Sequence, residues 1–140
     1  MFKLHSTLEA DTVRIGELQL SVLLLSKDAN YPWLILVPKR AGIEEIYQLS
    51  ANDRQELMHE SYCLSKALVS LFNPHKLNIA TIGNMVPQLH MHHICRFHND
   101  ICWPKPVWGQ AQPRAYTKKQ CATLISNLRY QVALCGLVLI

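Results

Sequence analysis

A row of histidines that alternates with apolar residues is the feature that most constrains how this chain folds. Four of its seven histidines fall between His90 and His98, and three of these lie in the segment QLHMHHICRF, residues 88–97. Side chains on a β-strand point alternately to opposite faces of the sheet, so this spacing produces one polar row and one mostly apolar row. We therefore predict a strand over residues 88–97 that covers the core with one face and presents reactive groups on the other.

The polar row of this strand carries the residues that point to a function. Gln88, His90 and His92 fall on one face, together with Ile94 and Arg96. Imidazole, amide and guanidinium groups donate hydrogen bonds to oxyanions such as phosphate, and imidazole titrates near neutrality, so it can act as nucleophile, base or acid. Because buried polar side chains are costly unless they are used, we interpret this row as a site for phosphoryl chemistry, with Gln88, His90 and His92 as candidate catalytic residues.

The other histidines and the arginine receive different interpretations. His93 falls on the mostly apolar face, where a single imidazole is more often a structural residue whose polar atoms are satisfied. We expect Arg96 to help solvation or dimer contacts rather than catalysis. Structural roles are also expected for the histidines outside the motif strand: His5, His59, His75 and His98.

Length and composition favour a single domain over residues 1–140. At 140 residues and 49% hydrophobic composition, the chain can bury one core without needing disulfides or a metal. No repeat or linker divides it. Only 17% of the residues are charged and the formal net charge is +4, which suits an anionic small ligand and does not indicate a specific nucleic-acid partner.

Cysteine usage and the lack of membrane signals favour a cytoplasmic protein. The five cysteines form an odd set without a C-x-x-C pair, which predicts reduced thiols rather than a disulfide framework. The first residues, MFKLH, do not resemble a signal peptide, and no apolar stretch reaches membrane-spanning length. We expect the apolar tail, residues 132–140, to pack on the chain's own surface or on a partner's.

Hydrophobic periodicity and punctuation by proline and glycine predict an α+β fold. In the first half of the chain we expect two strands within 13–26 joined near Gly16, a strand over 33–37, and a helix from its cap Ser50 to Phe72. In the second half we expect a strand over 77–82, the motif strand over 88–97, and a loop and helix over 103–134, in which the helix runs from Thr117 to Leu134. The order of strands, helix, strands and helix predicts a mainly antiparallel sheet of about five strands.

The motif segment resembles a known family. The sequence QLHMHHI, residues 88–94, is similar to the histidine triad motif, in which histidines alternate with hydrophobic residues. The likeness extends to YPWLILVPKR at residues 31–40, to LNIA at 77–80 and to Trp103-Pro104, so that it covers most of the chain from about residue 10 to 110. The resemblance implies a compact α+β domain that forms a homodimer and binds a purine nucleotide or nucleotide conjugate against the sheet, beside the motif strand.

The same resemblance implies a mechanism. The family's middle histidine is a nucleophile and falls on His90, while His92 would bind phosphate oxygens. Asn78 falls about where the family places an amide near the phosphates, and Asn84 lies in the loop before the motif, so both are candidate ligands of phosphate or ribose. The alternative for each is a turn-forming or edge-strand amide. His90 would attack the α-phosphorus of a dinucleoside polyphosphate or a nucleoside phosphoramidate. Water would then release the nucleoside monophosphate from the nucleotidyl-histidine. This chemistry implies neither a metal nor a cofactor.

Two positions depart from the family pattern. Gln88 takes the place of the first histidine, as in a bacterial-type variant, and Ala41 falls where some branches carry a histidine after the Pro-Lys segment. A glutamine can donate a hydrogen bond but cannot shuttle a proton. The choice between phosphoramidates and polyphosphates therefore stays open.

Two alternatives to an enzyme stay open as well. The chain could be a nucleotide-binding module in which the change at Gln88 has ended turnover. Alternatively, His90 and His92 could chelate zinc or copper with Cys95 or Cys102, although Cys95 falls on the opposite face of the strand.

Overall fold

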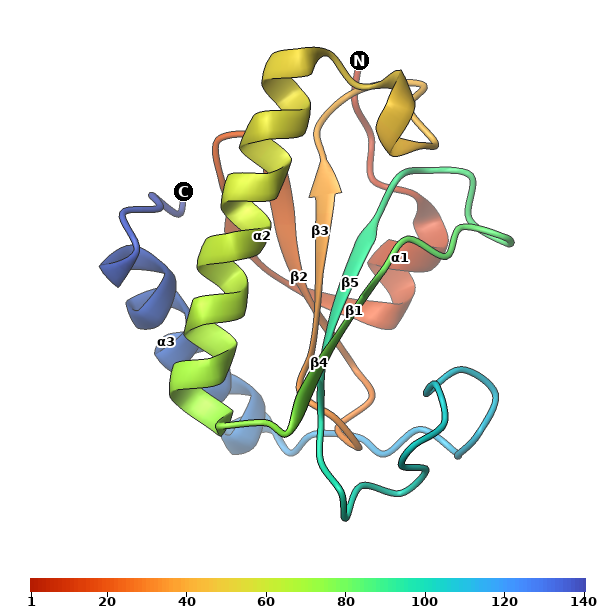
Figure 1. Ribbon diagram of the computed structural model, residues 1–140, viewed down its shortest axis with the longest axis vertical. Helices are drawn as coiled ribbons and strands as arrows, with labels where there is room; N and C mark the ends of the chain where they lie inside the picture. The colour runs from red at the N-terminus through yellow and green to blue at the C-terminus, as the bar shows by residue number, and fades with distance from the viewer.

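The computed structural model describes all 140 residues and is built on one five-stranded antiparallel sheet (Figure 1). Its elements in chain order are α1 (Ser6–Asp11), β1 (Thr12–Glu17), β2 (Ser21–Ser26), β3 (Trp33–Pro38), the 3-10 helix η1 (Ile46–Gln48), α2 (Ala51–Phe72), β4 (Lys76–Ala80), β5 (Met91–Arg96) and α3 (Lys118–Leu134). The predicted α+β class and the antiparallel sheet of five strands are confirmed.

The strand order places the motif strand inside the sheet. The order is β1-β2-β3-β5-β4, and every neighbouring pair is antiparallel. His92 on β5 lies opposite Ile35 of β3 on one side and Ala80 of β4 on the other. An interior strand is held by hydrogen-bond ladders on both sides, so β5 is a rigid support for the side chains that it carries.

The two long helices cover one face of the sheet, and the sequence predicted their ends well. The Ser50 hydroxyl accepts a hydrogen bond from the backbone N–H of Asp53, and Asn73, with φ of 44°, ends α2 in the left-handed conformation. The Thr117 side chain caps α3 by accepting from the N–H of Gln120. No helix is both long enough and apolar enough to cross a membrane.

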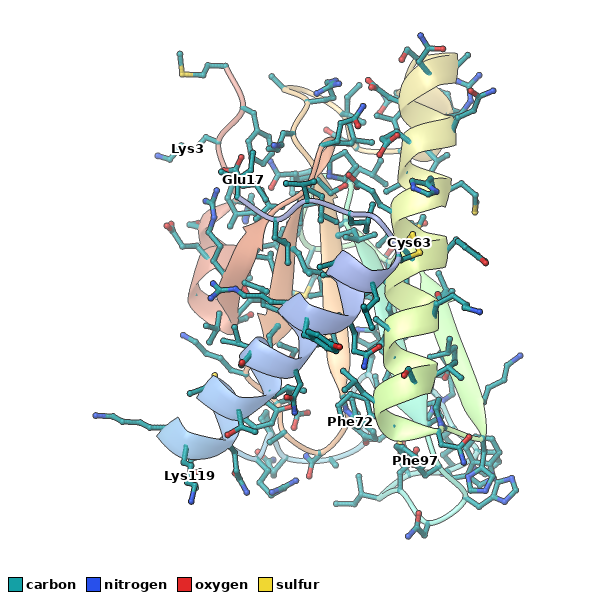
Figure 2. All side chains as sticks on the ribbon, turned by 90° about the vertical axis from the view of Figure 1, so that its left-hand side faces the viewer. Lys3, Glu17, Cys63, Phe72, Phe97 and Lys119 are labelled. Atoms are coloured by element: carbon teal, nitrogen blue, oxygen red, sulfur yellow. A yellow bond between two sulfur atoms is a disulfide. The ribbon has the colours of Figure 1, made fainter.

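The main core lies between this sheet face and the two helices (Figure 2). Strand residues and helix residues contribute apolar side chains to it in alternation, as the pleat requires. Its buried members include Leu23, Leu25, Leu34, Leu36, Leu57, Leu64, Met91, Cys95, Leu128 and Val132.

The opposite face is covered by short segments instead. Figure 1 shows α1 on this side of the sheet, and the long loop between β5 and α3 runs past its lower end. Leu8 of α1 is buried against β2 and β3, with Phe2 and Leu4 packed beside it. The sequence did not predict α1, because a helix of 6 residues carries too short a period to detect.

Gly16 lies in a bulge and not at the predicted turn. The register between β1 and β2 shifts between Arg14 and Gly16. A Cβ atom at Gly16 would lie 3.0 Å from Leu139 Cδ2 and 3.1 Å from the Ile140 carbonyl oxygen. The bulge therefore admits the C-terminal tail, whose Ile140 exchanges two backbone hydrogen bonds with Glu17. Leu137 and Leu139 of the tail pack against the chain's own core, while the side chains of Val138 and Ile140 are exposed.

The prediction of five reduced thiols is wrong for one pair. A disulfide joins Cys63 on α2 to Cys135 at the end of α3, where the Cα atoms lie 5.6 Å apart, and the other three cysteines are free. The pair is separated by 72 residues, so only the packing of α3 against α2 brings the two side chains together. The cytoplasmic location stays a prediction.

Candidate functional site

The motif strand is shorter than predicted, but it keeps the alternation. β5 runs from Met91 to Arg96, and residues 88–90 precede it. Their backbone leaves the ladder because the N–H of Gln88 donates to the Val86 carbonyl and that of Leu89 donates to the Ile43 carbonyl. The two candidate histidines still meet, since the ring centroids of His90 and His92 are 4.9 Å apart.

The hydrogen bond made by His90 fixes which of its nitrogens can act as a nucleophile. Its Nδ1 lies 2.6 Å from the backbone carbonyl oxygen of Gln88. A carbonyl only accepts, so Nδ1 carries the proton and Nε2 of the neutral ring keeps its lone pair. The residue is 5% exposed, and its backbone-anchored ring is held in one orientation.

Gly83 lies beside the same ring and was not predicted as a site residue. A Cβ atom at Gly83 would lie 3.8 Å from Cε1 of His90 and only 3.0 Å from the carbonyl oxygen of Val86. Glycine thus lets the loop before the motif approach the imidazole. Asn84, the next residue, is exposed in this loop, and its predicted contact with phosphate or ribose stays a prediction.

The hydrogen bond that His92 accepts places its proton on the other ring nitrogen than in His90. The indole N–H of Trp33 donates to its Nδ1 at 3.0 Å, and an indole can only donate, so the proton of the neutral His92 ring is on Nε2. Burial, together with the nearby rings of His90 and His93, lowers the pKa of His92 to about 3. At neutral pH, His92 is therefore an uncharged hydrogen-bond donor beside His90.

Two tryptophans pack against His92. The ring of Trp108 meets that of His92 edge-on at 5.1 Å, and it meets Trp33 edge-on at 5.8 Å. Sequence reasoning treated Trp33 only as an apolar strand residue. The pairing of β3 with β5, which places Trp33 opposite Ile94, is what brings its N–H to His92.

Gln88 contributes to the site through its backbone, while its side chain is engaged elsewhere. The amide Nε2 donates to the carbonyl of Lys3, and Oε1 accepts from the N–H of His5, both at 2.9 Å. Of the three predicted catalytic side chains, the structure therefore places His90 and His92 together and Gln88 against the N-terminal residues. A direct catalytic or phosphate contact by Gln88 stays a prediction.

Asn78 belongs to a neighbouring buried network. Its Oδ1 accepts a hydrogen bond of 2.9 Å from Arg96, and it pairs with Ile94 across β4 and β5. Its side-chain oxygen is thus occupied, whereas its amide N–H groups have no protein partner. Its predicted role near the phosphates stays a prediction.

Arg96 is an interior anchor, so the expectation that it serves solvation or a dimer contact is wrong. Its side chain is 1% exposed and forms an ion pair with Asp100 at 2.7 Å. The guanidinium also lies over the rings of Tyr31 and Trp103, at 5.5 and 5.7 Å from their centroids. A charge this deeply buried needs a partner, and the turn after β5 supplies Asp100 four residues later.

His93 has the structural role that was predicted for it. It faces the helices, where its Nδ1 donates to the carbonyl of Met91 at 3.1 Å and its Nε2 accepts from the Ser61 hydroxyl at 2.7 Å. Burial lowers its pKa to about 4, with the bond to Met91 opposing the shift. His93 therefore links β5 to α2, and His90 and His92 are left on the opposite face of the sheet.

The fold brings together no set of ligands that would support the metal hypothesis. No group of three or more His, Cys, Asp or Glu side chains is arranged so that it could hold a metal ion. Cys95 is buried in the core on the helix side, and burial raises the pKa of its thiol to about 12. Of the ligands that this hypothesis named, His90 and His92 are the two whose rings meet, with centroids 4.9 Å apart.

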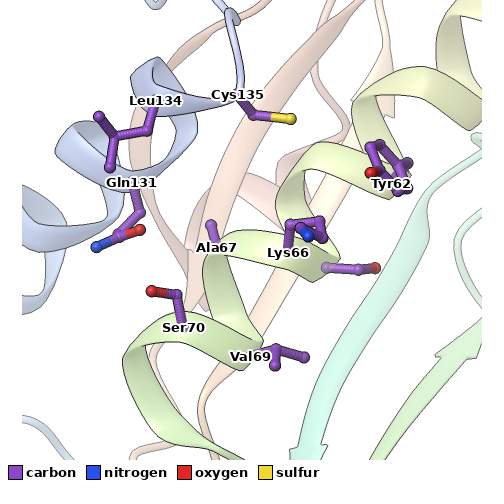
Figure 3. A pocket seen from close by; sticks show the side chains of 9 residues that line it. Tyr62, Lys66, Ala67, Val69, Ser70, Gln131, Leu134 and Cys135 are labelled. Carbon is purple, nitrogen blue, oxygen red and sulfur yellow. The ribbon is translucent and has the colours of Figure 1, made fainter.

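A groove elsewhere on the molecule is separate from this site. It lies between α2 and α3, has a volume of about 570 Å³, and is lined from both helices by side chains that include Tyr62, Val69 and Leu134 (Figure 3). These helices cover the sheet face opposite to His92. The groove is therefore not part of the candidate active site.

Solved structures of histidine triad proteins share this architecture. The chain is 47% identical to the one from Bradyrhizobium japonicum, with a TM-score of 0.92 over 94% of this chain and 98% of that chain. It is 46% identical to the one from Marinobacter aquaeolei VT8, with a TM-score of 0.93 over 96% and 98% of the two chains. A third, from Sinorhizobium meliloti 1021, is 36% identical, with a TM-score of 0.91 over 94% and 97%.

The family assignment follows from these matches and from the site. Residues 7–99 match the model of the HIT domain family, where HIT stands for histidine triad. The chain therefore belongs to the HIT domain family, as the motif resemblance indicated. None of the curated proteins matches the chain.

Proposed function

We propose that this protein hydrolyses nucleotide conjugates at the α-phosphate, or transfers the nucleotidyl group, through a nucleotidyl-histidine intermediate on His90. The observation that carries the proposal is that the two neighbouring rings are protonated on different nitrogens, so that one Nε2 is an acceptor and the other is a donor. His90 presents a free Nε2 lone pair because its Nδ1–H binds the Gln88 carbonyl. His92 presents an Nε2–H because Trp33 donates to its Nδ1.

A lone pair on Nε2 of His90 beside an N–H donor on His92 suits attack on phosphorus. As Nε2 of His90 forms its bond to the α-phosphorus, the bond to the leaving group breaks, and the ring becomes an imidazolium that keeps its proton on Nδ1. The Gln88 carbonyl, already 2.6 Å away, then accepts a charge-assisted hydrogen bond. The Nε2–H of His92 stabilises the negative charge that develops on the phosphoryl oxygens.

The second half of the reaction restores the enzyme. Water attacks the same phosphorus and loses one proton to solvent, the bond between phosphorus and Nε2 breaks with its electron pair returning to Nε2, and the nucleoside monophosphate leaves with His90 neutral again. We assign further phosphate or ribose contacts to the exposed Asn84, to the free amide N–H groups of Asn78, and to Gln88 when its amide is released from the N-terminal residues.

The same geometry favours leaving groups that need no proton. His92 stays neutral at working pH because its pKa is lowered to about 3, and an amide such as Gln88 does not protonate a leaving group. A polyphosphate departs as a stable anion, whereas an amine must be protonated. We therefore propose dinucleoside polyphosphates and related anhydrides as better substrates than phosphoramidates.

The test is release of nucleoside monophosphate from a panel of dinucleoside polyphosphates and phosphoramidates, with chelator present throughout. His90→Ala should abolish release, while His59→Ala, the same change at an exposed histidine of α2, should leave it unchanged. Trapping a nucleotidyl adduct on His90 by mass spectrometry would identify the intermediate.

Other outcomes separate the alternatives. Nucleotide binding without turnover of any substrate would support the non-catalytic module instead. Loss of release on chelation would support a metal-dependent site. Equal turnover of amine and phosphate leaving groups would contradict the proposed substrate preference while leaving the role of His90 intact.

We also propose that the protein is a homodimer formed around the free edge of β4. Ile79 on this edge is 48% exposed, and Met58 and Tyr62 of α2 are 63% and 56% exposed. Leu77 and Ile79 share the strand face that packs toward the helices, so these apolar residues lie on one side of the molecule. Sedimentation should show a dimer that Tyr62→Glu dissociates, whereas Tyr130→Glu, on the exposed surface of α3, leaves it intact.

A further inference from the structure

The side chain of Gln88 joins the N-terminal arm, residues 1–5, to the motif. Both ends of its amide are occupied by backbone groups of the arm, with Nε2 donating to the Lys3 carbonyl and Oε1 accepting from the His5 N–H. These groups lie 85 and 83 residues away in the chain. The arm is therefore fastened to the residue whose own carbonyl orients His90.

Apolar contacts hold the arm on the catalytic face of the sheet. Phe2 and Leu4 pack against a cluster that contains Ile35 and Val86. Ile35 lies directly opposite His92 in the ladder between β3 and β5, so its side chain points to the same face. The arm thus packs on the sheet face that carries His92, against a cluster that contains the cross-strand neighbour of His92.

The catalytic pair is almost completely covered in this arrangement. His90 is 5% exposed and His92 is 6% exposed. A nucleotide must bring its α-phosphorus into line with Nε2 of His90, and the near-complete burial of this residue limits that approach.

Of the covering segments, the arm is the one that can move. It is held by one side-chain amide and two half-buried side chains, and a segment with so few buried contacts opens more easily than the rest of the fold. The loop after β5 is instead fixed by the buried ion pair of Arg96 with Asp100.

We propose that the N-terminal arm is a strap over the catalytic histidines, that Gln88 latches it through its side-chain amide, and that substrates reach His90 when this latch opens. The inference rests on the proposed function, because it concerns access to the same nucleophile. It gives the glutamine at the first triad position a role of its own, which is to control admission to the site.

Access to His90 can be measured without turnover, by carbethoxylation with diethyl pyrocarbonate followed by peptide mass spectrometry. In the native protein, His90 should react far more slowly than the exposed His59 in the same molecule. Gln88→Ala removes both hydrogen bonds of the latch, and we expect it to speed the modification of His90 by about tenfold. Phe2→Ala, which removes an apolar anchor of the arm, should act in the same direction.

Lys3→Ala is the matched control. The latch uses the Lys3 carbonyl and not its exposed side chain, so this change within the arm should leave the reactivity of His90 unchanged. Circular dichroism and thermal unfolding establish that each variant is folded. Where Gln88→Ala does not fold, Phe2→Ala carries the test alone.

The possible outcomes test the strap separately from the proposed covalent mechanism. If His90 reacts as fast as His59 in the native protein, or if folded Gln88→Ala and Phe2→Ala both react like the native protein, the strap is refuted even where turnover depends on His90. If modification follows the latch as expected and yet no nucleotide turns over, the strap is supported and the covalent mechanism fails.

Discussion

The hydrogen bond from Trp33 to His92 gives the sharpest test of how the site is tuned. Trp33→Phe leaves an aromatic ring packed near His92 but removes the indole N–H that reaches Nδ1 at 3.0 Å. His92 is 6% exposed, so water does not readily replace the lost donor. The variant therefore leaves a buried acceptor without a partner.

The structure allows the size of each effect to be worked out. An unsatisfied buried acceptor costs about 1 to 3 kcal/mol, which for a chain of this length lowers Tm by roughly 3 to 10 °C. Because the indole N–H binds only the neutral ring, its loss should raise the pKa of His92 from its value of about 3. The proton of His92 is also no longer confined to Nε2, and kcat should fall by about 10- to 100-fold as donation to the phosphoryl group weakens.

Three measurements read these effects separately. Thermal unfolding gives the stability change, nitrogen-15 NMR of the histidine rings gives the tautomer and pKa of His92, and monophosphate release gives kcat. Trp108→Phe is the matched control, because Trp108 contacts the His92 ring edge-on and makes no hydrogen bond to it. We expect this variant to lose packing energy while the Nε2–H tautomer of His92 persists.

The reasoning is refuted by either of two results. One is a Trp33→Phe protein in which the tautomer, pKa and kcat all match those of the native protein. The other is an equal loss of kcat in Trp33→Phe and Trp108→Phe with no change in the tautomer of either, which would show that only ring packing matters.

Three further predictions concern stability. Arg96→Met leaves buried Asp100 without its partner and should lower the free energy of unfolding in urea by about 3 to 5 kcal/mol. Arg40→Met breaks an ion pair whose arginine is 45% exposed and should lower it by about 1 kcal/mol or less. Equal losses in the two variants would contradict this prediction. The pKa of His93 is lowered to about 4, against 6.5 for a free histidine, so the unfolded chain takes up a proton first as the pH drops. Stability should therefore fall between pH 6.5 and 4, and His93 should contribute on the order of 3 kcal/mol of that fall, in addition to the contribution of His92, whose pKa is also lowered. His93→Gln should reduce the slope in this range without abolishing it, and an unchanged slope would contradict the prediction. Cys135→Ser removes the disulfide between α2 and α3 and should lower the free energy of unfolding by about 2 to 4 kcal/mol; a native protein whose stability is insensitive to reductant would contradict the prediction.

Much of the fold was readable from local signals. The cap at Ser50, the break at Asn73-Pro74 and the cap at Thr117 place both long helices to within a residue of their observed ends. These signals work because capping and helix termination are decided by backbone groups within a few residues of each other. The short helix α1 and the bulge at Gly16 were not predicted, because neither produces a periodic pattern in the sequence.

Part of the site was readable for a similar reason. The alternation in residues 88–97 placed His90 and His92 on one face, and the structure brings their rings within 4.9 Å. Strand geometry alone dictates that side chains two residues apart share a face. The resemblance to the histidine triad motif then assigned the nucleophile to His90.

The partners of these histidines were decided only by the tertiary structure. Trp33 reaches His92 because β3 and β5 are neighbours in the sheet. Gln88 binds the backbone of residues that lie more than 80 positions earlier in the chain, and Cys63 meets a cysteine 72 positions later. Such contacts depend on strand order and helix packing, which local periodicity does not encode.

The electrostatic character of the site also belongs to the tertiary structure. The sequence shows which residues can titrate, but the pKa of His92 is lowered because the folded chain buries the ring among other rings. Arg96 is an interior anchor because the turn after β5 returns Asp100 to it. The sequence by itself determined the strands, the two long helices and the row that carries His90 and His92. The fold decided which groups face that row, because burial and long-range contacts exist only once the sheet has assembled.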